Sequence, residues 1–416
     1  MNKKLFLLEL NEFNINILKY YSKKYNLTNI QKILKFNKTD TYTNDRYIGD
    51  NNQFGYLDPW SQWVSVHTQT PSKVHKIKNL GDIPSLKLKQ IWEKRKNDFY
   101  IWGPMNASKK NSKNVKVFFP DPWVYSEKAH PSKLNNILIP IKKITKSRGK
   151  LSNKKKLILI FKLIKNLKMY LSIKDLNNFF INLFKGYFKF GNKNLVQIIA
   201  WEDLSFRIFI NFFKKKDNFF AIFFLNSLAH VQHHYWKKKN DSEEIIYCLK
   251  KIDTLIDYLL KIKNIELIIF NGLSQINVED DKLYLYEQIS HEEFLNSIGI
   301  KFKRIEKLMT NDAFVFFNTS KDKNRCAKLL DKVRFKSKKI FFVETQKDKK
   351  LFYKTNYIKK VSKYDKLTIN KKKITFLKYF QLITLRRGIH SHNGEILSQK
   401  KHFPKRIPNH KFFNYI

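Results

Sequence analysis

Three histidines follow a strongly apolar segment in the middle of the chain. Residues 219–225 (FFAIFFL) form an unbroken apolar run, and Asn226, His230, His233 and His234 come directly after it. Such a run is typical of a strand that is covered on both faces. Ligands of open α/β sheets collect just past the carboxyl ends of strands of this kind. Because imidazoles bind zinc and other transition metals, we expect this polar loop to line a site that holds a metal ion.

Two other expected strands also end at an asparagine. Residues 4–10 lead into Asn11, and residues 265–270 lead into Asn271. If all three strands are parallel, their ends share one edge of the sheet. We therefore expect these asparagines to lie near the histidine-bearing loop.

The segment 57–80 is a second stretch with chemistry-bearing side chains, and it begins with two tryptophans. Trp60 and Trp63 either pack in the core or form an aromatic wall for a sugar or nucleotide, and both interpretations stay open. The hydroxyl and imidazole groups of the stretch are Ser61, Ser65, His67, Thr68 and His75. His67 is interpreted as a core residue.

Strands and helices alternate along the chain, which predicts βαβ units. The expected fold class is α/β, with a mainly parallel sheet flanked by helices. Further strands are expected at 99–102 and 115–119, and helices at 14–25, 85–95, 201–214 and 241–261. The segment 37–56 is polar and turn-rich.

The predicted domains are two core parts interrupted by two insertions and completed by the C-terminus. The core occupies 1–137, 196–284 and the C-terminal return 371–416. A basic helical insertion spans 138–195, with helical patterns at 157–171 and 175–188. A small α+β cap spans 285–370, with strands near 314–317 and 339–344 and a helix at 327–333.

The chain is very basic, with 82 Lys and Arg against 35 Asp and Glu and a net charge of +47. The lysines are spread along the chain, so bulk composition bias and a polyanionic partner both remain open. No nucleic-acid-binding motif is present. The basic helix 157–171 is either an ordinary solvated helix or one that lies on an anionic membrane surface.

The two cysteines lie far apart in the sequence, at Cys248 and Cys326. They give neither a disulfide framework nor zinc-finger spacing, so a reducing compartment fits best. No signal peptide or membrane-spanning helix is expected. We therefore expect a cytoplasmic protein, with peripheral membrane attachment left open.

The order of these motifs resembles the alkaline phosphatase superfamily along nearly the whole chain, in particular its type I phosphodiesterase/nucleotide pyrophosphatase-like and sulfatase-like members. The stretches PWSQWVSVHT (59–68) and AHVQHHYW (229–236) are similar to those of uncharacterised members found among bacterial surface-polysaccharide genes. The resemblance implies an alkaline phosphatase-like core with a site for two metal ions.

Three asparagines stand where the resemblance places metal-binding residues. They are Asn11, Asn226 and Asn271, and Glu9 is a substitute ligand for the first. Amide oxygens carry no charge, and hard cations favour anionic oxygen, so two dications would be held weakly. The expected cofactor is a divalent metal, zinc or manganese, as one ion or none rather than two.

At the positions where the resemblance places metal ligands, the histidines are kept more often than the carboxylates. The resemblance makes His230 and His390 metal ligands, with His233 as a catalytic residue and His234 as a substrate contact. The structural alternative, in which these histidines pack or cap a strand end, stays open.

The resemblance places the nucleophile at Pro59, which cannot attack. Asp58 and Ser61 are the nearby candidates for that role.

Two functions follow from the resemblance. The first is a metal-assisted hydrolase or transferase that acts on a phosphate ester, a phosphodiester or a sulfate ester of a glycan or nucleotide-sugar. The second is a catalytically degenerate member that serves as a binding or scaffolding module in surface-glycan assembly. An anionic small molecule or glycan is the expected partner in both.

Overall fold

The computed structural model describes residues 4–45, 58–147, 151–191, 194–345, 349–369 and 372–416. These residues form two compact units. Unit 1 comprises residues 4–45, 58–277 and 388–416, and unit 2 comprises residues 278–387.

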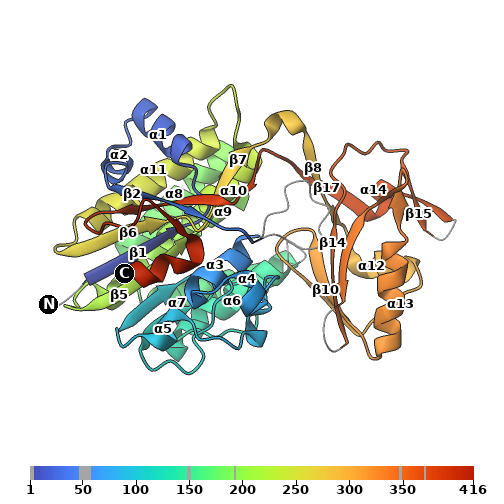
Figure 1. The fold of residues 1–416 in the computed structure, drawn as a ribbon, viewed down its shortest axis with the longest axis horizontal. Coiled ribbons are helices and arrows are strands. Elements are labelled where there is room, and N and C mark those ends of the chain that lie inside the picture. Colours follow the sequence, from blue (N-terminus) through green and yellow to red (C-terminus); the bar gives the residue numbers. More distant parts are fainter. Residues whose placement is uncertain (1–3, 46–57, 148–150, 192–193, 346–348, 370–371) are drawn as a thin grey trace. The chain divides into compact units, whose positions relative to one another are not determined.

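An eight-stranded sheet is the centre of unit 1 (Figure 1). All of its strands run parallel except β19, which lies antiparallel to both of its neighbours. The predicted α/β class with a mainly parallel sheet is therefore confirmed. In spatial order the strands are β20 (Arg406–Pro408), β2 (Asn37–Tyr42), β19 (Asn393–Ser398), β6 (Ile265–Phe270), β1 (Lys4–Leu10), β5 (Phe219–Leu225), β3 (Phe99–Trp102) and β4 (Val115–Phe119).

The three central strands β1, β5 and β6 have the bounds that their apolar runs predict. Both faces of these strands are covered, which explains why their sequences lack alternation. Phe223 of β5 contacts Phe209 on one face of the sheet, and Phe224 contacts Trp63 on the other. Side chains therefore alternate between two helical layers.

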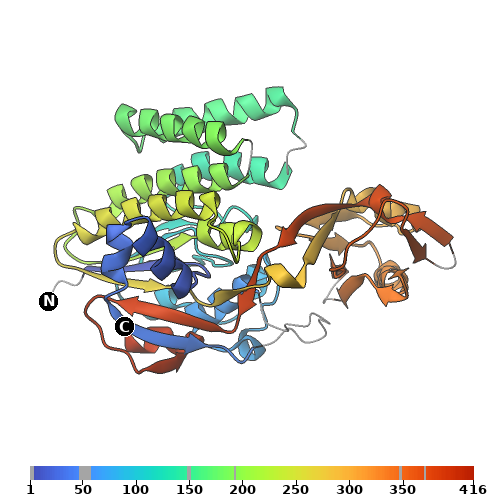
Figure 2. The same cartoon turned by 90° about the horizontal axis from the view of Figure 1, so that it is seen from above.

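One face of the sheet is covered by long helices (Figure 2). Phe209 and Phe213 pack against Phe6 of β1 from this side. The helices are α1 (Ile15–Lys24), α2 (Thr28–Ile33), α9 (Asn194–Phe213) and α11 (Glu243–Leu260). Helix α6 (Asn135–Ser147) lies at the level of α9, and α7 (Asn153–Leu167) and α8 (Ile173–Phe190) form a second layer over α6 and α9.

The opposite face is covered by shorter elements. They are α3 (Pro59–Thr68), α4 (Ser72–His75), η1 (Ile83–Ser85), α5 (Ile91–Lys94) and the C-terminal η4 (Asn409–Tyr415). Trp63 of α3 and Phe412 of η4 both contact Phe270 of β6. The predicted helix 85–95 is reduced to the single turn of α5.

Three elements differ from the sequence predictions. The expected turn-rich segment 37–56 begins with strand β2, in which Thr39 and Thr41 are buried alternately; its residues 46–56 lie outside the described part. Every residue of α3 is buried, so this helix has no polar face and no helical period in its sequence. The predicted histidine loop is the helix α10 (Ser227–Tyr235), whose polar side chains hide its period.

In its described residues, unit 2 combines three α-helices with small antiparallel sheets around its own core. One sheet has the order β13–β14–β10–β9, a second has the order β12–β11–β15–β16, and β8 pairs with β17. The bounds are β8 (Leu283–Gln288), α12 (His291–Ser297), β9 (Arg304–Lys307), β10 (Asp312–Phe316), α13 (Ser320–Asp331), β11 (Arg334–Phe335), β12 (Lys338–Lys339), β13 (Phe341–Thr345), β14 (Lys350–Thr355), β15 (Lys366–Ile369), β16 (Lys372–Thr375), α14 (Phe376–Tyr379) and β17 (Phe380–Arg386).

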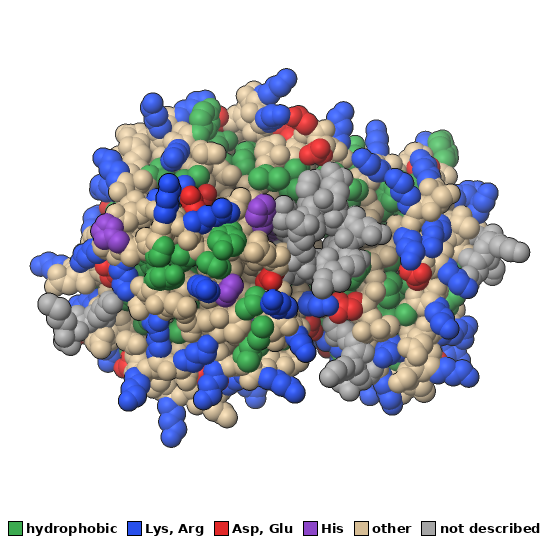
Figure 3. Space-filling view, viewed as in Figure 1, with side chains coloured by type: hydrophobic (Ala, Val, Ile, Leu, Met, Phe, Trp, Pro, Cys, Tyr) green, Lys and Arg blue, Asp and Glu red, His purple; other side chains and the backbone are tan. Residues whose placement is uncertain are grey.

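Basic side chains are spread over the face of the molecule in Figure 3 rather than gathered in one patch. Within the described ranges, no helix has both the length and the apolar character that crossing a bilayer requires.

Candidate functional site

The carboxyl ends of β1, β5 and β6 meet at one edge of the sheet. Leu10 lies opposite Leu225, and Glu9 lies opposite Phe270, so the residues that follow these strands are neighbours. The backbone N–H of Asn11 donates to the carbonyl of Leu225 at 2.9 Å. The predicted meeting of the three strand ends is confirmed.

Asn11 and Asn226 hydrogen-bond to each other at this edge. Asn11 Nδ2 donates to Asn226 Oδ1 at 2.8 Å, and Asn11 Oδ1 accepts from Trp63 Nε1 at 2.8 Å. Trp63 thus holds the orientation of the Asn11 amide from beneath. The role of these two amides as metal ligands stays a prediction.

Asn271 ties β6 to β19 instead of joining the asparagine pair. Its Nδ2 donates to the carbonyl of Phe13 at 2.9 Å and to Glu395 Oε2 at 2.8 Å. Its Oδ1 accepts from the backbone N–H of Glu395 at 2.9 Å. All of these bonds are structural, because they fix the turns that follow β1 and β6.

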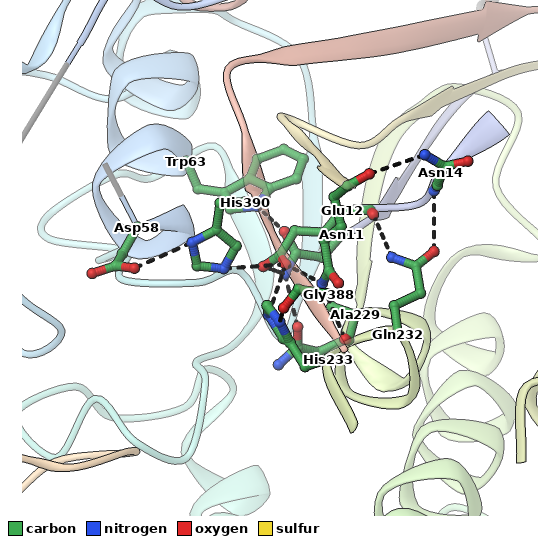
Figure 4. A network of polar contacts seen from close by, with 12 residues as sticks. Asn11, Glu12, Asn14, Asp58, Trp63, Ala229, Gln232, His233, Gly388 and His390 are labelled. Atoms are coloured by element: carbon green, nitrogen blue, oxygen red, sulfur yellow. Dashed lines mark hydrogen bonds and ion pairs between the residues drawn. The ribbon is translucent and has the colours of Figure 1, made fainter. Parts of the chain in front are cut away.

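Glu12 is the residue on which the histidines converge (Figure 4). It has a left-handed backbone with φ of 57°, and its side chain is 2% exposed. Its Oε2 lies 3.1 Å from His233 Nε2 and 3.3 Å from His390 Nε2. The side-chain amide of Gln275 donates to the same oxygen at 2.5 Å. Glu12 was not among the site residues predicted from the sequence, although its place directly after Asn11 was a usable signal.

His390 reaches Glu12 from a short strand pair. Strand β18 (Gly388–Ser391) pairs with β7 (Ser274–Asn277), and His390 lies opposite Gln275. The late histidine predicted from the resemblance is therefore brought to the same sheet edge as His233.

The far ring nitrogen of each imidazole is held by an acceptor. His390 Nδ1 lies 3.2 Å from Asp58 Oδ1, and His233 Nδ1 lies 2.8 Å from the carbonyl of Gly388. A carbonyl or carboxylate can only accept, so each Nδ1 carries a hydrogen and donates. Both Nε2 atoms therefore face Glu12 with a lone pair unless they are protonated.

Three acceptor groups that face one another require a proton or a cation between them. Charge attraction from Glu12 and Asp58 outweighs burial and raises the pKa of His390 to about 9. The pKa of Glu12 lies well below its ordinary value: burial raises it, and the larger combined effect of His390 and His233 lowers it. Without metal, the proton on His390 balances the buried carboxylate.

Glu12, His233 and His390 also fit a metal ion. Their ligand atoms lie within 4.8 Å of one another. One carboxylate and two imidazoles are the protein ligands of many catalytic zinc sites, which keep a further position for water or substrate. Held Nδ1 atoms are the usual support of metal-binding imidazoles.

His230 and His234 lie outside this group of three. They are one turn apart on α10, and their rings stack with centroids 6.4 Å apart. Burial, followed by repulsion from His233, lowers the pKa of His230 to about 4, so its ring is neutral near pH 7. Of the histidines on α10, His233 is the one that contacts Glu12.

Glu9 is turned toward α3 and away from the histidine group. Its Oε1 lies 2.7 Å from His67 Nε2, and both side chains are fully buried. His67 is therefore a core residue, as the sequence suggested.

The hydroxyls of α3 are also fully buried. Ser61 Oγ donates to the carbonyl of Ile77 at 2.7 Å. His75 Nδ1 accepts from the Ile77 N–H, so its hydrogen is on Nε2 and points to Ser65 Oγ at 2.9 Å. This tautomer cannot take a proton from Ser65.

The tryptophans of α3 and the residue before it are placed differently. Trp60 Nε1 donates to the carbonyl of Lys78, and Trp63 is fully buried. Asp58, at the N-terminus of α3, contacts His390 and has 23% of its side chain exposed. Among the predicted catalytic residues, Asp58 and His233 are thus brought to Glu12 and His390, and Ser61 is not.

Glu202 of α9 anchors the helix that carries His233. Its Oε1 accepts from the backbone N–H groups of Asn226 at 2.6 Å and Ser227 at 2.8 Å. These N–H groups begin α10, and they have no partner within the helix. Burial raises the pKa of Glu202 to about 7.

No protein-family model matches this sequence, and the comparison with curated proteins yields no significant match. Solved structures similar to the chain include a phosphonoacetate hydrolase from Sinorhizobium meliloti 1021 in complex with phosphonoformate, with 10% identity and a TM-score of 0.45 over 100% of this chain and 95% of that one.

Two further similar structures are of other enzymes. Murine ectonucleotide pyrophosphatase/phosphodiesterase 5 shares 9% identity, with a TM-score of 0.45 over 99% of this chain and 93% of that one. Alkaline phosphatase from the Antarctic bacterium TAB5 shares 10% identity, with a TM-score of 0.40 over 100% and 97%.

Proposed function

We propose that unit 1 is a metal-dependent hydrolase that acts on a phosphate or sulfate ester. The observation that carries this proposal is the convergence of two imidazole Nε2 atoms on the buried carboxylate of Glu12, with both Nδ1 atoms held from behind. A metal ion bound there would take the place of the His390 proton that otherwise balances the buried carboxylate.

Glu12, His233 and His390 would hold the ion. A zinc or manganese ion bound there would polarise an ester oxygen and lower the pKa of a bound water. Glu12 supplies the anionic charge, and Gln275 fixes its carboxylate by donating to Oε2. Asp58 and the Gly388 carbonyl keep the two imidazoles in the tautomer that presents Nε2.

Asp58 lies on the Nδ1 side of His390, opposite Glu12, and its side chain is partly exposed. We assign it the orientation of the His390 imidazole, because Asp58 Oδ1 accepts from His390 Nδ1. The overall reaction adds water across the ester bond and releases an alcohol and a phosphate or sulfate. The ester of a glycan or a nucleotide-sugar is the substrate class that the sequence resemblance implies.

A binding module without turnover is the second candidate. The Asn11–Asn226 pair favours it, because these amides satisfy each other and bring no negative charge to the edge. Among the described residues, one group of His, Cys, Asp and Glu side chains has metal-binding spacing. The proposed site therefore holds a single ion.

Metal titration tests the site. We expect zinc or manganese to bind the wild-type protein, and Glu12→Gln and His233→Ala to raise the dissociation constant at least about tenfold, because each removes one of three ligands. His234→Ala is the matched control, since it removes a neighbouring imidazole of α10 that lies outside the group. Equal loss in His234→Ala, or no loss in the other variants, would contradict the proposed ligands.

Turnover separates the two functions. The metal-loaded protein should hydrolyse an aryl phosphate, an aryl phosphodiester or an aryl sulfate, and Asp58→Asn should slow this reaction at saturating metal. Tight metal binding with no hydrolysis of any of the three substrates would favour the binding module.

A further inference from the structure

The helices α7 and α8 form the outermost layer of unit 1, farther from the sheet than α6 and α9 (Figure 2). Helix α7 packs on α6, and α8 packs on α9. In α8, the inward face is formed by Leu176, Gly186 and Phe190. The outward faces of both helices are therefore the ones that meet their surroundings.

Large apolar side chains cover the outward faces. Phe188 is 97% exposed, Ile173 75%, Phe161 70% and Phe184 69%. Such side chains normally belong inside a soluble protein, and contiguous exposed apolar surface marks an interaction site. Leu157, Ile158, Ile160 and Ile181 are exposed on the same two helices.

The apolar side chains of α8 form one stripe. Ile181, Phe184 and Phe188 follow one another at spacings of three and four residues, which places them on a single face of the helix. Helix α8 therefore has two apolar faces. One is buried and packs on α9, and the other points outward. Folding of unit 1 accounts for the first face only.

Positive charge is concentrated on the same two helices. Residues 153–190 contain nine lysines and one acidic residue, Asp175, whose carboxylate pairs with Arg207 at 3.1 Å. The lysines are Lys154, Lys155, Lys156, Lys162, Lys165, Lys168, Lys174, Lys185 and Lys189. Lys189 pairs with Glu243, and the remaining lysines leave the surface strongly cationic.

Charge complementarity indicates whether a second copy of this chain or a lipid bilayer fits such a surface. A second copy of this chain would bring the same lysines face to face, which like-charge repulsion opposes. An anionic lipid bilayer complements both features, because its headgroups attract lysine and its acyl boundary accepts phenylalanine.

We propose that α7 and α8 are a docking surface for anionic membranes. Phe161, Phe184 and Phe188 enter the headgroup boundary, and Lys174 and Lys185 contact lipid phosphates. The helices lie on the bilayer without crossing it. This proposal is independent of the proposed metal site, and it would stand if that site had no function.

Vesicle flotation with the full chain tests the proposal. We expect binding to phosphatidylcholine vesicles that contain about a third phosphatidylserine, and little binding to phosphatidylcholine alone. Phe184→Ser/Phe188→Ser should weaken binding at least about tenfold. Lys174→Gln/Lys185→Gln should weaken it roughly 25-fold, from about fivefold per lysine. Both pairs are exposed, so circular dichroism and the melting temperature should stay unchanged.

Two matched controls accompany these variants. Lys87→Gln/Lys89→Gln makes the same charge change at exposed lysines before α5, and Tyr364→Ser removes an aromatic ring that is 76% exposed in unit 2. Neither should change vesicle binding by more than about twofold. If the controls weaken binding as much as the test variants, bulk charge carries the binding and the proposal is overturned.

A direct result against the proposal is also available. Wild-type protein that stays unbound by anionic vesicles at about 50 mM NaCl would overturn it, because screening is weak at that ionic strength. Concentration-dependent dimerisation that Phe184→Ser/Phe188→Ser abolishes would assign the surface to a second copy instead.

Discussion

Asp58 stands behind His390 on the side opposite Glu12, with 3.2 Å between Asp58 Oδ1 and His390 Nδ1. Removing such a partner from a metal-bound histidine typically weakens metal affinity 10- to 100-fold. We therefore expect Asp58→Ala to raise the zinc dissociation constant by about that factor. Asp58→Asn should raise it less, because the amide oxygen still accepts from Nδ1. Competition with a chromophoric chelator measures both.

Asp98→Asn is the control for the change in charge, since Asp98 pairs with Lys116 on the surface. If His390→Ala weakened zinc binding while Asp58→Ala did not, the orienting role of Asp58 would be wrong.

Gly388 provides a second test at the scale of one residue. A Cβ there would lie 2.2 Å from Gln275 Oε1 and 2.9 Å from the carbonyl of Gln232. Gly388→Ala should therefore cost about 1–3 kcal/mol of folding free energy, as overpacking does. It should also weaken metal binding, because Gln275 holds Glu12 and the Gly388 carbonyl holds His233.

Urea unfolding and metal titration of the same sample check the two effects of Gly388→Ala. Gly191→Ala is the comparison: no atom lies within 4 Å of its added Cβ, and its φ of +68° alone should cost about 1–2 kcal/mol. A loss of metal affinity in Gly191→Ala would show that the effect at Gly388 is not local.

The sequence identified the histidines better than the carboxylate. His390 and His233 were candidates because imidazoles at strand ends are conspicuous. Glu12 was missed because the resemblance directs attention to Asn11, and the residue that follows a strand normally points to the other face. The left-handed backbone of Glu12, with φ of 57°, turns its side chain to the edge, and no sequence pattern announces this.

Helix α10 depends on Glu202 for its position. The raised pKa of this carboxyl, about 7 against an ordinary 4.5, means that the folded state binds the proton more tightly than the unfolded state. The protonated carboxyl thus favours folding below pH 4.5, and this contribution is lost as the pH rises through 7. Glu202→Gln, which keeps an acceptor, should gain stability relative to wild type over this window, by up to about 3 kcal/mol.

Denaturant unfolding of wild type and Glu202→Gln at several pH values between 4.5 and 8 measures this difference. Asp203→Asn is the neighbouring control, as Asp203 pairs with Arg207 near the surface. A difference between wild type and Glu202→Gln that is constant with pH would mean that Glu202 is ionised in the folded protein throughout.

Elements were predicted where burial leaves a period or a pure apolar run. β5 and β6 were placed to the residue, and α11 within two residues, because its inward face repeats at helical spacing. Helix α3 was missed since it is buried on every side, and α10 since its histidines interrupt the apolar face. In helices next to a site, functional polar side chains occupy positions that would otherwise hold the apolar residues of the helical repeat.

At the scale of the molecule, the order of apolar strands was enough to predict a mainly parallel sheet. The antiparallel insertion of β19 between β2 and β6 was not predictable, because strand order depends on long-range pairing rather than on local pattern. Strand β2 (NKTDTY) has no aliphatic residue, and β19 (NGEILS) has only Ile396 and Leu397, so neither resembles a central strand in sequence.

Net charge is the property of the whole chain that remains to be explained. With 82 basic and 35 acidic residues, the folded state carries a strong self-repulsion that the expanded unfolded state relieves. Salt screens this repulsion, with a Debye length of about 10 Å at 0.1 M. At pH 7, raising NaCl from about 20 mM to about 500 mM should therefore increase the melting temperature by about 2–5 °C.

Near pH 10, the sequence pI, the same salt step should have little effect, because most of the net charge is gone. Calorimetry at both pH values checks this. An equal rise at pH 10 would point to general exclusion of salt from the surface, and a fall at pH 7 would mean that ion pairs such as Lys24–Asp241 outweigh the repulsion.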